Sequence, residues 1–263
     1  MRRLIDWFFY LLAFSTLSPN EWLIALFLNT LLITLAQRLP ILTKLGWFHA
    51  GALGTILWGC LGWKGWLSVV IYLFLGSLVT KIGYTYKKSK GIAEARGGSR
   101  GPENVWGSAA TGAFLAVLLK IFEGAGPHLE LLCIGFAASF AAKLADTFGS
   151  EIGKRWGRRP LLITTFKRVP AGTDGAISIA GTFASLVGSL LMTSVMSLLS
   201  FIPNGYGFLI VVISAFLATI AESFLGALVQ FRFRWLTNEL VNSIQTSFAA
   251  SIAILLAYTV KTY

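Results

Sequence analysis

The stretch AAKLADTFGSEIGKRWGRRPLLITTFKRVPAGTDGAISIAG, residues 141–181, organises the rest of the chain. It begins at the end of one apolar run and ends at the start of another, with charged side chains and glycines between them. Charged residues make up only 13% of the chain. Because so many of these few charges gather between two apolar runs, we expect the chemistry of the protein to lie here.

The composition is typical of a membrane protein. Of the 263 residues, 56% are hydrophobic, and the mean hydropathy is +0.72. Soluble domains are about 45–50% apolar, and several apolar runs here approach the ~20 residues that span a bilayer as a helix. We therefore expect an all-α, polytopic membrane protein with a single membrane domain over residues 1–263. The net charge of +11 is then explained by basic cytoplasmic loops and by binding to anionic phosphate groups, rather than by a nucleic-acid partner.

The apolar runs predict about seven to nine helical segments. These segments cover residues 4–17, 21–38, 48–62, 65–81, 105–122, 129–148, 176–200, 206–229 and 240–260. The first segment imitates a signal peptide, but Asp6 interrupts it and no small-residue cleavage site follows. We expect it to be retained, and whether it crosses the membrane stays open.

The distribution of basic residues agrees with these segments. Paired crossings place most lysines and arginines on one side, together with the polar loops 82–104, 149–175 and 230–239. The exceptions are Lys64, Lys120 and Lys261 on the other side, and Lys143 within a span. The positive-inside rule makes the basic side cytoplasmic. We expect the three loops to form one site at the cytoplasmic face of the membrane.

Asp146 is a candidate functional carboxylate because it lies near a helix end at membrane depth, where an unpaired charge is costly. Small and polar residues share one helical face with it. They are Ser139, Ala142, Ser150 and Gly153. Such a face has room for a phosphate and a hard oxygen ligand for a metal ion. The alternative is a structural ion pair between Asp146 and Lys143.

Glu222 is a second candidate carboxylate, deep in the apolar segment 206–229. A carboxylate from a second helix would complete a divalent-metal site with Asp146. The alternative is a neutral, hydrogen-bonded structural glutamate. Glu151 is open between metal binding and an ion pair with Lys154 or its neighbour in the basic run.

Two glycine-rich stretches suggest phosphate binding. Arg96 and Arg100 flank a Gly-Gly-Ser turn, and arginine recognises phosphate through a planar fork of donors. Asn104, Asn238 and Asn242 lie in or beside the polar loops and could orient a phosphate or a hydroxyl. The alternative is a solvated loop.

The second stretch follows the basic run that contains Lys154 and Lys167. Gly172 frees the backbone to approach a ligand, while Thr173 and Asp174 are good caps for the helix expected next. A helix N-terminus favours phosphate. The alternative is a glycine-rich connector with an ordinary helix cap.

Four stretches of the chain resemble a known family. They are GIAEARGGSRGPENVWGSAATGA (91–113), ADTFGSEIGKRWGRRPLLITTFKRVPAGTDGAISIAGT (145–182), AESFLGALVQ (221–230) and NELVNSIQT (238–246). They resemble the transmembrane protein 19 family, and within it the phytyl-phosphate kinases of tocopherol synthesis in photosynthetic organisms. The resemblance covers nearly the whole chain after about residue 25.

This resemblance implies an integral membrane enzyme of the cell inner membrane or the thylakoid membrane. The enzyme would phosphorylate a prenyl monophosphate, above all phytyl phosphate, to the diphosphate with a nucleoside triphosphate and Mg²⁺. A weaker similarity to cytidine-triphosphate-dependent dolichol kinases and cytidylyltransferases suggests CTP as the donor. Many relatives have aspartate where this chain has Glu222, and either carboxylate binds Mg²⁺.

The resemblance also suggests roles for these residues. Asp146 and Glu222 would bind the metal, and Asp146, Lys154, Lys167 and Arg96 would be catalytic. Substrate and nucleotide binding would fall to Arg100, Asn104, Ser150, Glu151, Gly172, Thr173, Asp174, Asn238 and Asn242. Two other functions stay open: a cytidylyltransferase acting on a lipid phosphate, and a transporter or flippase for an anionic solute. The sequence leaves the acceptor chain length, the nucleotide and the oligomeric state undetermined.

Overall fold

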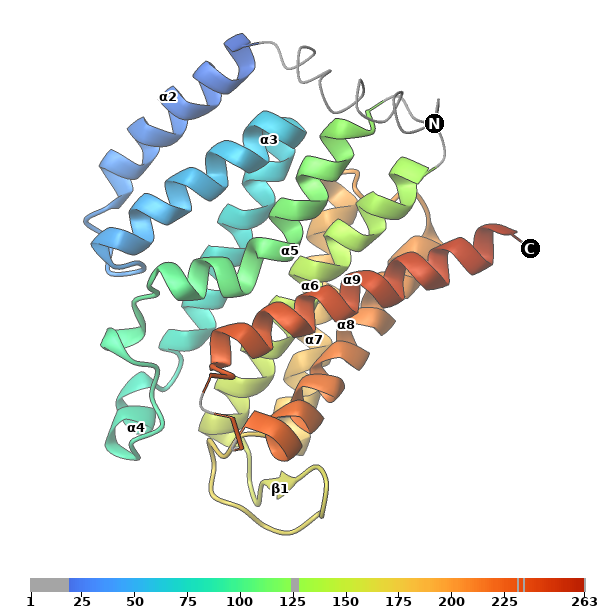
Figure 1. The fold of residues 1–263 in the computed structure, drawn as a ribbon. Coiled ribbons are helices and arrows are strands. Elements are labelled where there is room, and N and C mark those ends of the chain that lie inside the picture. Colours follow the sequence, from blue (N-terminus) through green and yellow to red (C-terminus); the bar gives the residue numbers. More distant parts are fainter. Residues whose placement is uncertain (1–18, 124–127, 231, 234, 263) are drawn as a thin grey trace.

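The computed structural model describes residues 19–123, 128–230, 232–233 and 235–262, so the expected segment 4–17 lies outside it. Helices account for most of these residues (Figure 1). The elements in order are α2 (Pro19–Ala36), α3 (Lys44–Lys81), α4 (Tyr84–Ser89), the 3₁₀ turn η2 (Arg96–Gly98), α5 (Pro102–Ile121), α6 (His128–Trp156), β1 (Leu161–Leu162), β2 (Ala176–Ile177), α7 (Ile179–Leu198), α8 (Gly205–Leu225), the π-helical turn η3 (Gly226–Gln230) and α9 (Asn238–Thr262).

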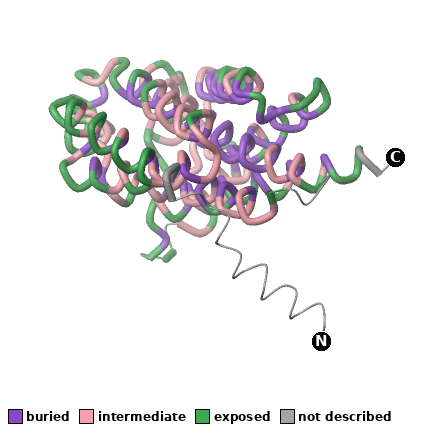
Figure 2. The backbone as a smooth tube through the Cα atoms, turned by 90° about the horizontal axis from the view of Figure 1, so that it is seen from above, coloured by how far each residue is buried: buried purple, intermediate pink, exposed green. Residues whose placement is uncertain are grey.

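Six of the described helices are long and apolar enough to cross a membrane, namely α3, α5, α6, α7, α8 with its π-helical turn, and α9. Exposed large hydrophobic side chains cover the outside of the bundle, among them Phe27, Phe74 and Leu255. Figure 2 shows exposed residues mainly around the rim and buried ones toward the middle. An apolar exposed rim is what lipid requires. The protein is an all-α polytopic membrane protein, as its composition predicts.

Helix α3 has two arms that meet at Gly62. The backbone of Gly62 is non-helical, with φ 66° and ψ −165°, a conformation that favours glycine. The chain changes direction there, so the arms match the separate segments expected at 48–62 and 65–81 (Figure 1). Beyond the break, the Lys64 amine donates a hydrogen bond of 3.2 Å to Ser200 Oγ at the end of α7.

Helix α6 forms the centre of the bundle and contacts α3, α5, α7, α8 and α9. Its buried residues between 135 and 145 are largely alanine and glycine, which let neighbouring backbones approach closely. The approach is closest to α7, where a Cβ on Gly188 would lie 2.9 Å from Leu144 O. The small side chains expected around Asp146 therefore serve helix packing as well as the site.

The helix directions bring the polar segments to one end of the bundle. Helices α3, α6 and α8 end there, while α5, α7 and α9 begin there. The segment between α6 and α7 hangs from this end as a loop with a two-stranded antiparallel ladder, pairing Leu161 with Ile177 and Leu162 with Ala176 (Figure 1). The sequence predicts no strand here. Helix α6 also continues past the expected end at 148, so Ser150, Glu151 and Lys154 are helical rather than in a loop.

Candidate functional site

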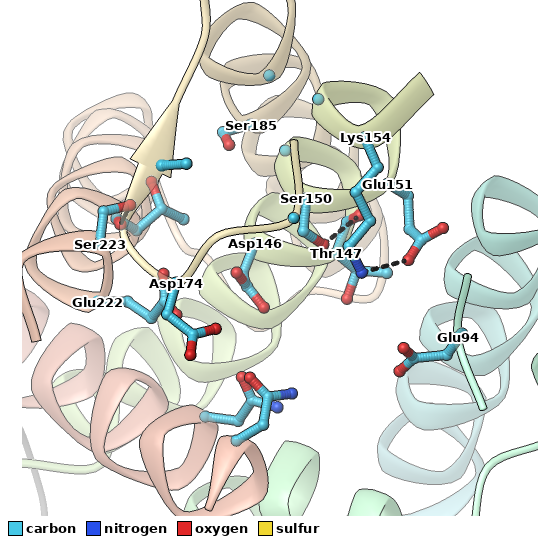
Figure 3. Close-up of a pocket in the computed structure, with 18 of the residues that line it drawn as sticks. Glu94, Asp146, Thr147, Ser150, Glu151, Lys154, Asp174, Ser185, Glu222 and Ser223 are labelled. Atoms are coloured by element: carbon cyan, nitrogen blue, oxygen red, sulfur yellow. Dashed lines mark hydrogen bonds and ion pairs between the residues drawn. The ribbon is translucent and has the colours of Figure 1, made fainter. Parts of the chain in front are cut away.

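A cavity of about 480 Å³ opens at this end of the bundle. Its walls come from the ends of α3, α6 and α8, the starts of α5, α7 and α9, and the segments 94–104 and 171–178. These regions include parts of all three polar loops that the sequence expects to form one site. Figure 3 shows carboxylate and hydroxyl side chains pointing into it from several helices.

Three carboxylates lie along one wall of the cavity. Asp146 comes from α6, Glu222 from α8, and Asp174 from the loop before β2 (Figure 3). Asp146 and Asp174 are close enough to Glu222 to interact with it electrostatically. Such a grouping is stable when cations offset the repulsion between the charges or when one of the carboxyl groups keeps its proton.

The loop that carries Asp174 is fixed against α8. Gly175 has φ 73°, and a Cβ there would lie 2.5 Å from the backbone oxygen of Ser223. Only glycine accommodates both this conformation and this approach. The contact places Asp174 next to Glu222, one residue before Ser223. The segment Gly172–Gly175 is therefore more than a connector, because it also positions Asp174.

Lys143 offsets part of this negative charge. Its amine donates a hydrogen bond to Asp146 Oδ2 from one turn earlier on α6, and both side chains are largely buried. The ion pair that the sequence allows is therefore present. It occupies one carboxylate oxygen of Asp146 and leaves Oδ1 without that partner, so the structural and functional interpretations are compatible.

The carboxylates fit a magnesium ion that is shared with phosphate. Among the described residues, no three His, Cys, Asp or Glu side chains group closely enough to hold a metal. Mg²⁺ commonly uses one or two carboxylates and takes its other ligands from substrate phosphates and water. Asp146 Oδ1 and Glu222, whose carboxylate has no hydrogen-bond partner in the described part of the chain, suit that role.

Arg96 is tied to the start of α5. Its guanidinium pairs with Glu103 and donates a 3.0 Å hydrogen bond to Asn104 Oδ1. Asn104 Oδ1 also accepts from Gly101 N at 2.9 Å, while its amide donates to Glu239 on α9 at 3.1 Å. Asn104 thus joins three segments of the wall, which is a positioning role. Arg96 itself has φ 52°, an uncommon backbone conformation for a residue other than glycine.

Arg100 is held differently. Its Nη1 donates a 3.0 Å hydrogen bond to the hydroxyl of Tyr72, a buried residue on the second arm of α3. Its backbone N–H donates to Ile41 O and its carbonyl accepts from Thr43 N, each at 3.0 Å. Both the backbone N–H and the backbone carbonyl of Arg100 are therefore bonded to the segment before α3.

Glu151 lies between two lysines. It pairs with Lys87 of α4, whose side chain is fully buried and also donates to Thr80 O at 2.7 Å. Its other oxygen lies 3.5 Å from the Lys154 amine. The pairing alternative for Glu151 is therefore present, and the carboxylate fixes Lys154 at the cavity wall.

This chain belongs to the DUF92 family. The model for this family of integral membrane proteins matches residues 27–250. The chain is 47% identical over 235 residues to the uncharacterized membrane protein sll0875 of Synechocystis, covering 89% of this chain and 90% of the relative. It is 39% identical over 243 residues to the chloroplastic protein VTE6 of Arabidopsis thaliana, covering 91% of this chain and 72% of VTE6.

A third relative also matches most of the chain. The uncharacterized membrane protein MJ0933 of Methanocaldococcus jannaschii is 32% identical over 247 residues, covering 91% of this chain and 97% of the relative. No solved structure matches the chain. The matches confirm the family resemblance of the four quoted stretches.

In this DUF92 chain, the cavity brings together nearly all residues that the sequence assigns to the site. The lining includes Asp146, Lys154, Arg96, Arg100, Asn104, Ser150, Glu151, Gly172, Thr173, Asp174, Asn238, Asn242 and Glu222. Asn242, on α9, is only 5% exposed, and its side chain has no hydrogen-bond partner among the described residues. An unpartnered amide in a cavity wall is costly unless water or a ligand satisfies it.

Two sequence expectations need correction. Lys167 is exposed at the turn of the loop between α6 and α7 and does not line the cavity. Thr173 does not cap the next helix, because the strand β2 intervenes and Ser178 caps α7 by accepting from Gly181 N at 3.2 Å. The Thr173 hydroxyl instead donates to Pro170 O at 2.8 Å within its own turn.

The sequence interpretation missed several lining residues. Tyr72, Glu94 and Ser185 line the cavity, while Lys87 lies just behind its wall. Tyr72 lies in an uninterrupted apolar run, and Lys87 is one of several loop lysines that look like orientation charge. Ser185 follows Ser178 and Thr182 on α7 at near-helical spacing, which is the one signal that could have identified it.

Proposed function

We propose that the cavity transfers a phosphoryl group from a nucleoside triphosphate to a prenyl monophosphate held in the membrane. One observation carries the proposal: Asp146 and Glu222, from two helices, face the same cavity as the cations Arg96, Arg100 and Lys154. Carboxylates that can bind a metal ion and cations that can bind phosphate are the two features that phosphoryl transfer requires.

The helix directions add to the positive side of this cavity. Helices α5, α7 and α9 all begin at it, and each N-terminus carries a partial positive charge and unpaired backbone N–H groups. Two phosphate-bearing substrates bring several negative charges. Three helix N-termini together with four basic side chains, Arg96, Arg100, Lys143 and Lys154, can hold both substrates in one place.

The residues of this chain would align and neutralise rather than form covalent bonds. Arg96 and Lys154 would offset charge on the transferred phosphoryl group, and Asn242 would orient a phosphate oxygen. The acceptor oxygen is already anionic, so no residue has to remove a proton from it. Asp146 Oδ1 and Glu222 would hold Mg²⁺, which when bound offsets phosphate charge and orients the two substrates.

A lipid acceptor suits the location of the cavity. The cavity lies at the ends of apolar helices in an integral membrane protein, where an amphiphile can place its head in the cavity and its tail among the helices. The resemblance to phytyl-phosphate kinases and the similarity to a chloroplastic relative favour phytyl phosphate. We propose CTP as the donor on the weaker similarity to CTP-dependent enzymes.

The test is an assay of purified protein with radiolabelled phytyl phosphate, Mg²⁺ and each nucleoside triphosphate in turn. The proposal predicts phytyl diphosphate and a nucleoside diphosphate as products, with CTP the preferred donor. A CDP-lipid with pyrophosphate would instead identify a cytidylyltransferase. No chemistry with any nucleotide or prenyl phosphate, from protein that is folded and monodisperse, would contradict an enzymatic function and favour transport.

A further inference from the structure

Tyr72 and Arg100 lie between the large polar cavity and a second, much smaller cavity. The second cavity measures about 30 Å³ and lies between the two arms of α3 and the start of α5. Most of its walls are apolar, with Leu53, Val69, Leu73 and Val105 among them. Four residues line both cavities and so form the boundary between them: Tyr72, Arg100, Asn104 and Ser108.

Arg100 differs from the other cations of the site. Arg96, Lys143 and Lys154 each pair with a carboxylate, whereas Arg100 forms no ion pair with any described carboxylate. Its hydrogen bond from Nη1 goes to the hydroxyl of Tyr72 and not to a carboxylate. A partly buried guanidinium without a counter-ion is a favourable partner for an incoming phosphate.

The guanidinium of Arg100 is also held in a fixed position. Its carbon lies 5.5 Å from the centroid of the Tyr72 ring, and a Cβ on Gly76 would lie 2.7 Å from Nη2. The Tyr72 ring in turn packs edge-on against Phe140 of α6, with centroids 6.0 Å apart. Tyr72 and Gly76 occur one helical turn apart on α3, so together they form a slot for this side chain.

We propose that Tyr72 and Arg100 bind the phosphate of the lipid acceptor and direct the first carbons of its prenyl chain into the small cavity between α3 and α5. The nucleotide then lies toward Asp174 and Glu222, and Asp146, which is close enough to Tyr72 to interact with it electrostatically, lies between the two substrates. This inference rests on the proposed function, because it locates the binding site of one of the two substrates in the proposed reaction.

The match between this boundary and a prenyl phosphate is chemical. Such a molecule has an anion joined directly to a hydrocarbon chain, and the boundary joins an unpaired cation directly to an apolar cavity. A soluble anion would need only the cation. Because a cavity of about 30 Å³ holds only a few carbon atoms, the rest of the chain extends between α3 and α5 toward the lipid.

A kinetic comparison tests the role of Tyr72. Tyr72→Phe removes the hydroxyl that positions Arg100, and the KM for phytyl phosphate should rise about 5-fold or more while the nucleotide KM stays within about 2-fold. Tyr206→Phe is the matched control, since Tyr206 is 72% exposed at the start of α8, away from the cavity. A change in the nucleotide KM alone, or wild-type KM values for both substrates, would overturn the assignment.

Gly76→Ala provides a second variant that displaces Arg100 without removing a hydrogen-bonding group. The added methyl group pushes against Nη2, the far end of a flexible side chain, so the fold should tolerate it. The same rise in lipid KM is expected. Gly205→Ala is its control, because a Cβ there has no neighbour within 4 Å. If Gly76→Ala and Gly205→Ala both have wild-type lipid KM values, the slot around Arg100 does not position the acceptor.

Photo-crosslinking gives a readout that does not depend on turnover. A phytyl phosphate that carries a diazirine on its first isoprene unit should label peptides containing Leu73 and Val105, and unlabelled phytyl phosphate should compete. Labelling confined to α7 and α8, or none that is competed, would overturn the inference. Turnover with labelling of α7 and α8 would contradict the inference alone. Competed labelling at Leu73 and Val105 without any phosphorylation would contradict the proposed function and leave the subsite supported.

Discussion

Lys143 donates a hydrogen bond to Asp146 from one turn earlier on the central helix, and both side chains line the same cavity. The bond uses Asp146 Oδ2 and leaves Oδ1 without that partner. A buried carboxylate needs such a cation, since an uncompensated charge would be costly. The ion pair is therefore compatible with a metal–phosphate ligand at Asp146 rather than excluding one.

Asp146→Asn should abolish turnover while the protein still folds and inserts. The amide preserves the shape of the side chain but removes the charge that would bind Mg²⁺ in the proposed function. Glu123→Gln is a matched control, because Glu123 pairs with Lys120 away from the cavity. Steady-state assays and a thermal melt in the same detergent measure both properties. Substantial activity in Asp146→Asn would leave this residue with only its structural role beside Lys143.

Glu222 should respond differently to two changes. Glu222→Gln removes the charge and should abolish turnover, whereas Glu222→Asp keeps a carboxylate and should retain measurable activity. The comparison separates metal binding from a neutral, hydrogen-bonded role, in which glutamine would be the better substitute. Titrating Mg²⁺ in the assay of Glu222→Asp should show a higher requirement than the wild type. If Glu222→Gln is as active as the wild type, Glu222 does not bind the metal.

Arg96→Lys should lower kcat/KM by about 10-fold or more, equivalent to roughly 1.4 kcal/mol of transition-state binding. Lysine keeps the charge but lacks the planar fork that would engage Asn104 and a phosphate together. Lys167→Ala, by contrast, should lie within about 2-fold of the wild type, because Lys167 is exposed outside the cavity lining. Kinetics in matched detergent compare the two. A larger loss in Lys167→Ala than in Arg96→Lys would show that the loop folds over the site.

Lys87 and Glu151 should be coupled in stability. Lys87→Met leaves a buried carboxylate with only the more distant Lys154, and breaking such a pair typically costs roughly 3–5 kcal/mol. Combining it with Glu151→Gln should recover much of the loss, because no uncompensated charge then remains. Thermal melts of the two single variants and the double variant form the cycle. Lys88→Met, an exposed neighbour on α4, serves as the control. Additive losses would show that the pair is not coupled.

The membrane side of the cavity can be measured directly. Single cysteines at Ser89 and Thr237, in a chain whose Cys60 and Cys133 are replaced, should be protected from an impermeant thiol reagent in intact cells. A cysteine at Trp63, next to the Gly62 break between the two arms of α3, should react from outside. This pattern follows from the excess of basic residues around the cavity. Labelling of Ser89 or Thr237 from outside would reverse the orientation.

Hydropathy and charge are sufficient to predict much of the fold, because each of the long helices coincides with a long apolar run in the sequence. They fail where a helix continues into polar sequence. Ser150 to Arg155 are too polar to appear as part of a span, yet they extend α6 because Glu151 has buried partners. The strand pairing of Leu161 with Ile177 was equally hidden, since it depends on contacts across a loop.

The site shows the same division. Asp146, Glu222 and Arg96 could be predicted because polar residues at membrane depth or in glycine-rich loops stand out from their surroundings. Tyr72 could not, because nothing in its apolar run reveals that Arg100 reaches its hydroxyl from a distant loop. Lys167 stood out for its charge, but charge alone does not show which way a loop folds.

The position of the transferred label tests the central claim most directly. Purified protein is incubated with phytyl phosphate, Mg²⁺ and CTP labelled at either the γ- or the α-phosphate, with Asp146→Asn as the blank. The account predicts that γ-label appears in phytyl diphosphate, that α-label stays in CDP, and that the blank shows neither transfer. Appearance of the α-label in the lipid, or no transfer of the γ-label from any nucleoside triphosphate by folded protein, would contradict it.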